Sequence, residues 1–209
     1  MKQTQTPWLA SFVGRLHYSL IVGRRSRVLS SILARQLPAG AAVLDIGCGD
    51  GTIARLIADS RPDISIEGVE TSPRANCQIR CMSYDGQKLP FQNQSFDVCL
   101  LVDVLHHTDN IAGVLGEASR VSRCFLLIKD HLSENALDYL TLKVMDWCGN
   151  IHHTVRTPFT YQSHRAWKQH FTNCNLIASS WTTRVPLYAF PVSLLAGRGL
   201  HFVSLLQKA

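Results

Sequence analysis

The chain has 209 residues, of which 46% are hydrophobic and 17% are charged, and its formal net charge is +6. This length and composition fit one globular domain with a single core, and the sequence contains no internal repeat or low-complexity segment. Seven cysteines stand at irregular intervals without paired C-x-x-C motifs, which excludes a disulfide scaffold and gives no reason to expect a bound metal. Cys77 and Cys81, four residues apart, are interpreted as structural residues on one face of a helix. We therefore expect a protein of a reducing cytoplasm.

The N-terminal arm carries the whole net charge, because residues 1–44 contain six basic residues and no acid. Its apolar residues recur at helical spacing and predict two amphipathic helices, one over residues 9–20 and one over 28–37, the second ended by Pro38. We expect a helical cap over residues 1–40, followed by the main domain. Contact of its basic face with an anionic membrane or an anionic substrate is the alternative. Nucleic acid is not expected, because aromatic residues do not alternate with the basic ones.

A glycine-rich turn follows the first strand pattern, which we expect over residues 42–46. The strand ends in the acid Asp45, and Gly47, Gly49 and Gly51 then precede a helical pattern over 52–59. Glycine lacks a Cβ, so such a loop turns tightly and lets a ligand approach the backbone and the helix N-terminus. The spacing matches neither the G-x-G-x-x-G dinucleotide motif nor a Walker loop. Asp45 is placed to hold a cationic group.

Three further motifs follow in chain order. A strand pattern over 64–69 ends before Glu70, which follows Gly49 by about the 20 residues expected of a carboxylate that binds ribose hydroxyls. A short strand near 79–83 precedes Asp85 and Gly86, and a strand over 97–102 precedes Asp103 and the pair His106-His107. In a parallel sheet these acids share the carboxyl edge, where open α/β sheets bind ligands.

Together these motifs resemble the class I S-adenosylmethionine (SAM) methyltransferases, in particular the type 11 subfamily that includes ubiquinone and menaquinone biosynthesis enzymes. The resemblance covers about residues 40–130, and it implies SAM as the cofactor, with Asp85 accepting a hydrogen bond from the adenine amino group. The residues that we expect to contact the cofactor are Asp45, Gly47, Cys48, Gly49, Glu70, Thr71, Asp85, Gly86 and Asp103. The chain departs from the family in lacking a proline and paired glycines before its fifth strand.

The alternation of elements predicts an α/β fold with a parallel sheet and helices on both faces. The resemblance implies the Rossmann-like fold of the family, with a mostly parallel seven-stranded sheet and an antiparallel last strand. We expect short helices near 73–79 and over 110–120, and a strand over 124–129. A helix over 134–147 should turn Leu137, Leu140, Val144 and Met145 inward, and another helix should cover 160–171. The closing strands are expected over 176–184 and 200–206. The SAM-binding domain is thus expected over 41–209.

The acceptor site is expected beyond the matching motifs, in the N-terminal helices, in residues 131–163 or in the loop over 187–198. The segment over 131–163, which contains His152 and His153, forms either a lid or a second core layer. The resemblance implies methyl transfer by in-line displacement, and we expect the acceptor to be the oxygen or carbon of a small, hydrophobic metabolite. His107 and His131 are the candidate bases, whereas His106 is expected to be structural. The Asn/Asp-Pro-Pro-aromatic tetrapeptide that binds planar exocyclic amines is absent after the fourth strand, which disfavours nucleobase methylation. A non-methylating reaction on the same fold, or a non-catalytic SAM-binding module, remain the alternatives.

Overall fold

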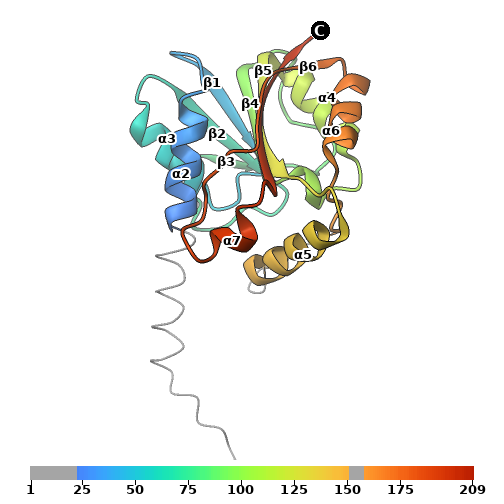
Figure 1. Ribbon diagram of the computed structural model, residues 1–209. Helices are drawn as coiled ribbons and strands as arrows, with labels where there is room; N and C mark the ends of the chain where they lie inside the picture. Colours follow the sequence, from blue (N-terminus) through green and yellow to red (C-terminus); the bar gives the residue numbers. More distant parts are fainter. Residues whose placement is uncertain (1–22, 151–157) are drawn as a thin grey trace, which may run out of the picture.

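The structure, a computed structural model, describes residues 23–150 and 158–209. Its described residues form one seven-stranded sheet in the order β3-β2-β1-β4-β5-β7-β6 (Figure 1). The strands are β1 (Ala42–Ile46), β2 (Ser65–Glu70), β3 (Cys81–Ser83), β4 (Phe96–Val102), β5 (Ser122–His131), β6 (Leu176–Thr182) and β7 (His201–Lys208). Strands β1 to β5 pair in parallel, and β7 pairs antiparallel with both β5 and β6. The predicted α/β class and the antiparallel last strand are confirmed.

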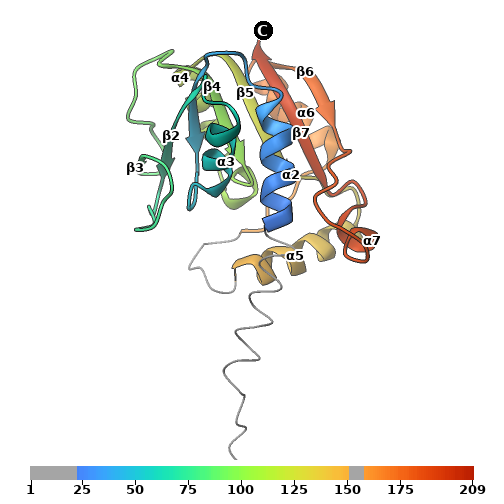
Figure 2. The ribbon, with the colours of Figure 1, turned by 90° about the vertical axis from the view of Figure 1, so that its left-hand side faces the viewer.

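Helices cover both faces of this sheet, as Figure 2 shows. Helices α2 (Gly23–Ala34) and α3 (Thr52–Ser60) pack on one face, where Leu29, Leu33 and Ile57 are fully buried against β1 and β4. Helices α4 (Ile111–Val121) and α6 (His164–Asn173) pack on the other, through residues such as Leu115 and Trp167. Burial on both faces explains why the central strands are continuous apolar runs rather than alternating ones.

The carboxyl ends of the parallel strands meet at one end of the sheet. The chain runs outward from β1 through β2 to β3, then returns to the other side of β1 for β4 and β5, so the strand order reverses between β1 and β4. Helices α5 (Ala136–Asn150) and α7 (Ser193–Ala196) lie at this end, opposite the C-terminus (Figure 1). A topological switch point of this kind is where open α/β sheets bind their ligands.

Two local expectations need correction. Residues 71–80, all of which the structure describes, form turns and bends without the predicted short helix. Helix α2 ends at Ala34, before the proline expected to stop it. Helix α4 runs directly into β5 at Ser122, whose extended ψ of 141° makes the turn within one residue, so no Pro-Gly loop is needed there. The predicted helix over residues 9–20 lies outside the described residues.

Helix α5 has the predicted position, but three of the four residues predicted to face inward are exposed. Leu137, Leu140 and Val144 are 53–58% exposed and Met145 is half-buried, whereas Leu142 is fully buried. The three exposed residues form a stripe at i, i+3 and i+7, and that periodicity identifies a face without saying which side it turns to. None of the described helices is long and apolar enough to cross a membrane.

Candidate active site

The glycine loop follows β1 and turns toward β2. Gly47, Gly49 and Gly51 all have positive φ, between 59° and 72°, which glycine adopts without strain. A Cβ at Gly47 would lie 2.6 Å from the Val104 side chain, so no larger residue fits there. The backbone N–H of Gly47 donates to the carbonyl of Val69 at 2.8 Å, which fixes the loop to the end of β2. The predicted tight turn is therefore present, and α3 begins directly after it.

Glu70, at the end of β2, holds this loop from the other side. Its Oε2 accepts a hydrogen bond from the backbone N–H of Gly49 at 2.9 Å, and its Oε1 accepts one from Thr71 at 2.8 Å. A carboxylate fixed by backbone donors needs little reorganisation to receive further hydroxyl donors. Glu70, Thr71 and the loop thus form one unit, as their motif spacing predicts.

Asp45 lies beneath the loop, and its side chain is almost fully buried. Burial, together with the nearby negative charge of Glu70, raises the pKa of Asp45 to about 8. A cationic ligand group beside Asp45 would favour its ionised form and would be held there in turn. This is the chemistry required by the ammonium group of a methionine moiety.

Asp85 and Gly86 follow β3 at the outer end of the same edge. The Asp85 Oδ1 accepts hydrogen bonds from the backbone N–H groups of Gln87 and Lys88, both at 2.8 Å, and these bonds lower the pKa of Asp85. Gly86 has a φ of 78°, and a Cβ there would lie 3.2 Å from Thr71, so the turn closes against the residue after β2. The structure thus brings together Asp45, Glu70 and Asp85, which the sequence placed at three separate strand ends. We call these residues and the glycine loop the glycine-loop side.

The other half of the edge is a group of buried and half-buried ionisable residues at the ends of β4 and β5. We call it the charged cluster; its members are Arg25, Asp103, His106, Lys129, Asp130 and His131. Asp103, directly after β4, pairs with Arg25 from α2 through Oδ2 and with Lys129 from β5 through Oδ1. These cations outweigh the opposing effect of burial and lower the pKa of Asp103 well below its usual value. Asp103 therefore joins three elements, with both oxygens engaged.

His106 forms the second half of the charged cluster. Its Nδ1 donates to Asp130 Oδ1 at 2.6 Å, and its Nε2 lies 3.4 Å from Asp146 on α5. Burial alone would lower the pKa of His106, but Asp130 and Asp146 raise it. Asp130 is itself held by the backbone N–H groups of Leu105 and His131. His106, predicted to be structural, thus lies between two carboxylates beside the predicted base His131.

The two predicted bases differ in their surroundings. The His131 Nδ1 lies 3.2 Å from the His106 Nδ1, and burial together with Lys129 lowers the pKa of His131. His107 is half-buried with its ring centroid 4.0 Å from that of His106, and burial lowers the pKa of His107 to about 4. Both imidazoles are therefore neutral near pH 7, the form that can accept a proton.

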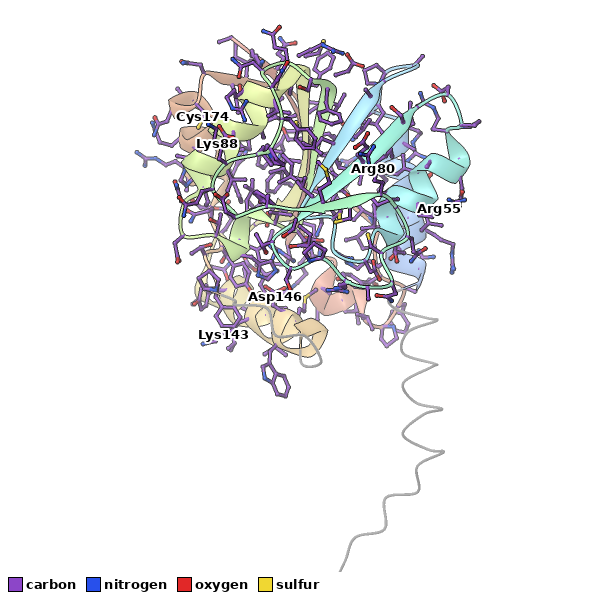
Figure 3. The ribbon with its side chains drawn as sticks, turned by 180° about the vertical axis from the view of Figure 1, so that it is seen from behind. Arg55, Arg80, Lys88, Lys143, Asp146 and Cys174 are labelled. Atoms are coloured by element: carbon purple, nitrogen blue, oxygen red, sulfur yellow. The ribbon has the colours of Figure 1, made fainter. Side chains whose placement is uncertain are left out.

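Helix α5 closes the charged cluster from outside. Asp146 lies on the side of α5 that faces the sheet (Figure 3), where it accepts a hydrogen bond from the Tyr161 hydroxyl. The outer face of α5 exposes Leu137, Leu140, Val144 and Trp147, and the neighbouring segment exposes Phe190, Leu194 and Leu195. Arg198 links the two by donating to Thr141. An apolar surface therefore lies next to the buried charges. His152 and His153, in the predicted lid over 131–163, lie outside the described residues.

Sequence reasoning missed several residues of the charged cluster. The charge pattern places Arg25 on the basic face of the N-terminal arm. Of Arg24, Arg25 and Arg27, however, only Arg27 is exposed, and Arg25 pairs with Asp103. Lys129 and Asp130 carry a signal that could have been used, because two charges within the apolar run of a central strand are costly unless they are paired. Asp146 and Tyr161 offer no such signal, because they meet only after the chain has folded.

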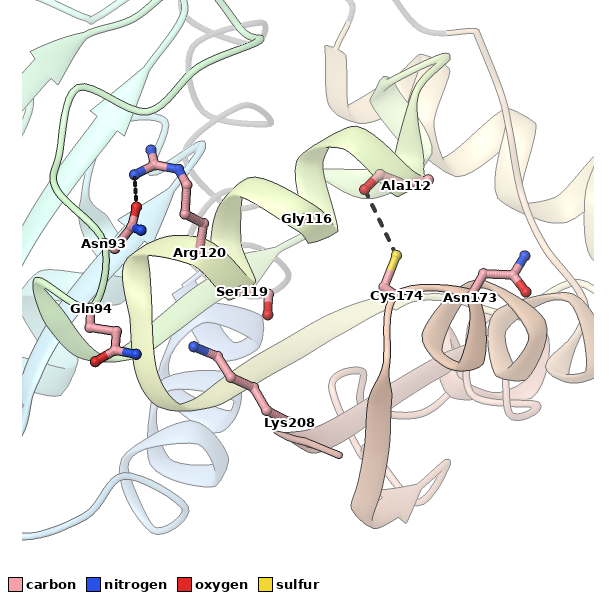
Figure 4. A pocket seen from close by; sticks show the side chains of 9 residues that line it. All are labelled: Asn93, Gln94, Ala112, Gly116, Ser119, Arg120, Asn173, Cys174 and Lys208. Atoms are coloured by element: carbon pink, nitrogen blue, oxygen red, sulfur yellow. Dashed lines mark hydrogen bonds between the residues drawn. The ribbon is translucent and has the colours of Figure 1, made fainter.

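A separate hollow lies at the opposite end of the sheet (Figure 4). It has a volume of about 570 Å³ and lies between α4, the end of α6 and the end of β7; residues that line it include Asn93, Arg120, Cys174 and Lys208. Because β7 is antiparallel to β5, Lys208 lies at the end of the sheet where the parallel strands begin. This hollow is therefore remote from the glycine loop and from the charged cluster.

Comparison with known proteins identifies the family of this chain. Residues 21–177 match the family model described as a methyltransferase domain. The chain is 38% identical over 93 residues to a demethylmenaquinone methyltransferase of Tropheryma whipplei (strain Twist), which covers 40% of this chain and 38% of the relative. It is 32% identical over 110 residues to the 27-O-demethylrifamycin SV methyltransferase of Amycolatopsis mediterranei, covering 46% of this chain and 40% of the relative. The chain thus spans about two fifths of the length of these curated relatives.

Among solved structures, the fold is similar to that of a Haloferax volcanii methyltransferase in complex with the Trm112 methyltransferase activator. The TM-score is 0.69 at 17% identity, and the match covers 100% of this chain and 99% of that one. At this identity the likeness concerns the fold alone, and it extends over the whole sheet and its helices.

Proposed function

Because the chain belongs to the family of methyltransferase domains, we propose that it transfers a methyl group from SAM to a small, hydrophobic acceptor. The observation that carries this proposal is that the glycine loop and the charged cluster share one edge of the sheet, on either side of the β1–β4 switch point. One half has the groups needed for the cofactor, and the other has groups that accept and hold protons.

The residues of the glycine-loop side fit SAM group by group. Asp45 would hold the ammonium group, Glu70 the ribose hydroxyls and Asp85 the adenine amino group, while Gly47, Cys48 and Gly49 would let the backbone approach the methionine moiety. When bound, SAM supplies an electrophilic methyl group on its sulfonium sulfur. Asp103 is the exception in this set, because its engagement by Arg25 and Lys129 supports a role in shaping the acceptor side.

The charged cluster would prepare the acceptor for attack. We assign His131 as the group that accepts the proton of an acceptor hydroxyl or acidic carbon, with His107 as the other candidate. Asp130 lies 3.5 Å from the His131 Nδ1 and would stabilise the charge that forms on the ring. His106, held by Asp130 and Asp146, would position His131 rather than react itself. Exclusion of water by α5 would keep the acceptor anion weakly solvated and reactive.

The apolar surface of α5 and α7 supports a hydrophobic acceptor. Trp147 and Leu194 are 61% and 63% exposed, which is costly in water unless an apolar partner covers such a surface. The relatives named for demethylmenaquinone and 27-O-demethylrifamycin SV support a small-molecule acceptor. The exposure of Arg27 alone among the three arginines of α2 weakens the alternative of membrane contact through that helix.

The decisive experiment is incubation with methyl-labelled SAM and a panel of apolar phenols, quinols and carbon acids, followed by mass spectrometry. We expect a labelled product and an equal amount of S-adenosylhomocysteine. The His131→Gln variant should transfer methyl about 100-fold more slowly while binding SAM with unchanged affinity, and His107→Gln is the matched comparison. Conversion of an acceptor without release of S-adenosylhomocysteine would instead indicate a non-methylating reaction.

A further inference from the structure

Three cysteines from separate parts of the chain gather beside the glycine loop. Cys48 belongs to the loop itself, Cys77 to the connection between β2 and β3, and Cys81 to the start of β3. Their sulfur atoms all lie within 4.8 Å of one another, and those of Cys48 and Cys81 are 3.4 Å apart. All three side chains are half-buried, and none is in a disulfide. We call this group the thiol cluster.

Two hydrogen bonds of Gln78 hold the β2–β3 connection, which contains Cys77, against the glycine loop. The connection over residues 71–80 has no helix in this fully described stretch, and it folds back so that the Gln78 N–H donates to the Asp50 carbonyl at 2.9 Å. The Gln78 side chain also donates to Thr52 Oγ1 at 2.7 Å, which fixes this segment to the start of α3. Cys77 is therefore held against the loop through its sequence neighbour.

Two glycines then make room for the sulfur atoms. A Cβ at Gly68 would lie 2.5 Å from the Cys48 Sγ, and a Cβ at Gly51 would lie 3.1 Å from the Cys77 Sγ. Any side chain at Gly68 would displace the Cys48 thiol, and one at Gly51 would press on that of Cys77. The thiol cluster therefore occupies space that the backbone of β2 and the loop leaves open.

The spacing of the sulfur atoms suits a metal ion with thiolate ligands. A zinc–sulfur bond of about 2.3 Å places tetrahedral sulfur ligands about 3.8 Å apart, which lies between the 3.4 Å and 4.8 Å that bound the thiol cluster. We propose that Cys48, Cys77 and Cys81 bind a soft divalent ion such as Zn²⁺ through three sulfur atoms, with a fourth position left to solvent. Thiols are the ligand type that selects such ions over Mg²⁺ or Ca²⁺.

The site has a structural consequence for the loop. Cys48 lies between Gly47 and Gly49, so an ion shared with Cys77 and Cys81 ties the glycine loop to the β2–β3 connection, where the sequence predicted a helix. The ion would hold the loop in the conformation described above. Metal binding is therefore expected to raise the unfolding temperature, because the ion binds the folded chain and not the dispersed thiols.

The test is titration of the reduced, metal-free protein with Co²⁺ and Zn²⁺ in the presence of a non-chelating reductant. We expect one ion per chain, with the thiolate-to-metal absorption of tetrahedral Co²⁺ and displacement of Co²⁺ by Zn²⁺. The Cys77→Ser and Cys81→Ser variants should each bind Co²⁺ about 100-fold or more weakly, since even outer-shell changes cost 10- to 100-fold. Both variants should lose the zinc-dependent rise in unfolding temperature.

Cys124→Ser is the matched control, because it removes an exposed thiol of β5 outside the thiol cluster. It should bind the ion like the parent chain. Absence of stoichiometric binding to the reduced protein would overturn the proposal, and so would equal affinities in Cys77→Ser and Cys124→Ser. Circular dichroism of each metal-free variant shows whether it is folded, and none of these measurements depends on methyl transfer.

Discussion

The two halves of the carboxyl edge are built in different ways. The glycine-loop side comes from one continuous stretch of chain, in which Glu70 and Asp85 accept hydrogen bonds from backbone N–H groups no more than 21 residues away in sequence. The charged cluster draws on α2, the end of β4, the turn Leu105–His107 and β5, and its contacts join side chains up to 78 residues apart. A site of the first kind is easily specified by a short motif, whereas the second kind depends on the whole fold.

This contrast predicts that loss of a paired charge in the charged cluster lowers the free energy of unfolding, whereas loss of an acid on the glycine-loop side mainly weakens ligand binding. The largest effect is expected for Asp103→Asn. Asn tolerates the left-handed φ of 57° at this position, so the change removes charge without adding backbone strain. It leaves Lys129 and Arg25 without their carboxylate and should lower the free energy of unfolding by about 3 kcal/mol or more.

Chemical denaturation of the ligand-free protein near pH 7 measures this loss. The contrast between the two halves would be wrong if the free energy of unfolding of Asp103→Asn lay within about 0.5 kcal/mol of that of the parent chain, which is the range of ordinary surface substitutions. Glu117→Gln serves as a control, because Glu117 pairs with Arg120 on α4, away from this edge.

On the glycine-loop side, Glu70→Ala should weaken SAM binding by about 1–3 kcal/mol, because the ribose hydroxyls and the Gly49 N–H lose their acceptor. Calorimetric titration measures the change, and Glu70→Gln should retain part of the affinity, since its amide oxygen still accepts. Glu67→Gln is the control, because Glu67 lies on the same strand and pairs with Arg80. Unchanged affinity in a folded Glu70→Ala protein would refute the assignment of ribose to Glu70.

The pH dependence of SAM affinity tests the role of Asp45 on the same side. Because the pKa of Asp45 is raised to about 8 in the free protein, its carboxyl is protonated at pH 7 and must lose that proton to hold an ammonium group. SAM affinity should therefore rise as the pH increases from 6 toward 8, by at most about 1.4 kcal/mol per pH unit. Calorimetry in two buffers of different ionisation enthalpy should detect proton release on binding, and Asp45→Asn should abolish that release.

The same raised pKa affects the stability of the free protein. The folded chain holds the Asp45 proton up to about pH 8, whereas the unfolded chain loses it near pH 4, so this residue lowers stability as the pH rises between those values. Asp45→Asn should remove this slope. Retention of an unchanged slope would show that Asp45 is not the group responsible.

The smallest effect on stability is expected on the exposed face of α5, in contrast to its buried face. Leu140→Ser should change the free energy of unfolding by no more than about 0.5 kcal/mol because Leu140 is exposed. Leu142→Ala, two residues away and fully buried, should cost about 2–4 kcal/mol. If the outer face of α5 meets the acceptor, Leu140→Ser should also raise KM for apolar acceptors. Equal losses of stability in both variants would mean that the outer face packs against something in solution.

The sequence by itself determined the topology of the core and the glycine-loop side. Alternating strand and helix patterns gave the parallel sheet, and an acid at each of the first strand ends could be read directly, because parallel strands finish at the same edge. The periodicity of α5 also gave its position. It did not give the direction in which the apolar stripe faces, because local spacing contains no information about what lies on either side.

Only the tertiary structure decided what the charged residues do. Arg25 and Asp103 are 78 positions apart and belong to different motifs, yet both are half-buried and form an ion pair, and Asp103 also pairs with the buried Lys129. The thiol cluster likewise requires the β2–β3 connection to fold back onto the loop. The sequence predicts a helix in that connection and therefore does not bring the three thiols together. Both groups consist of long-range side-chain contacts, whose partners are chosen by the packing of the sheet and helices and not by the spacing of residues along the chain.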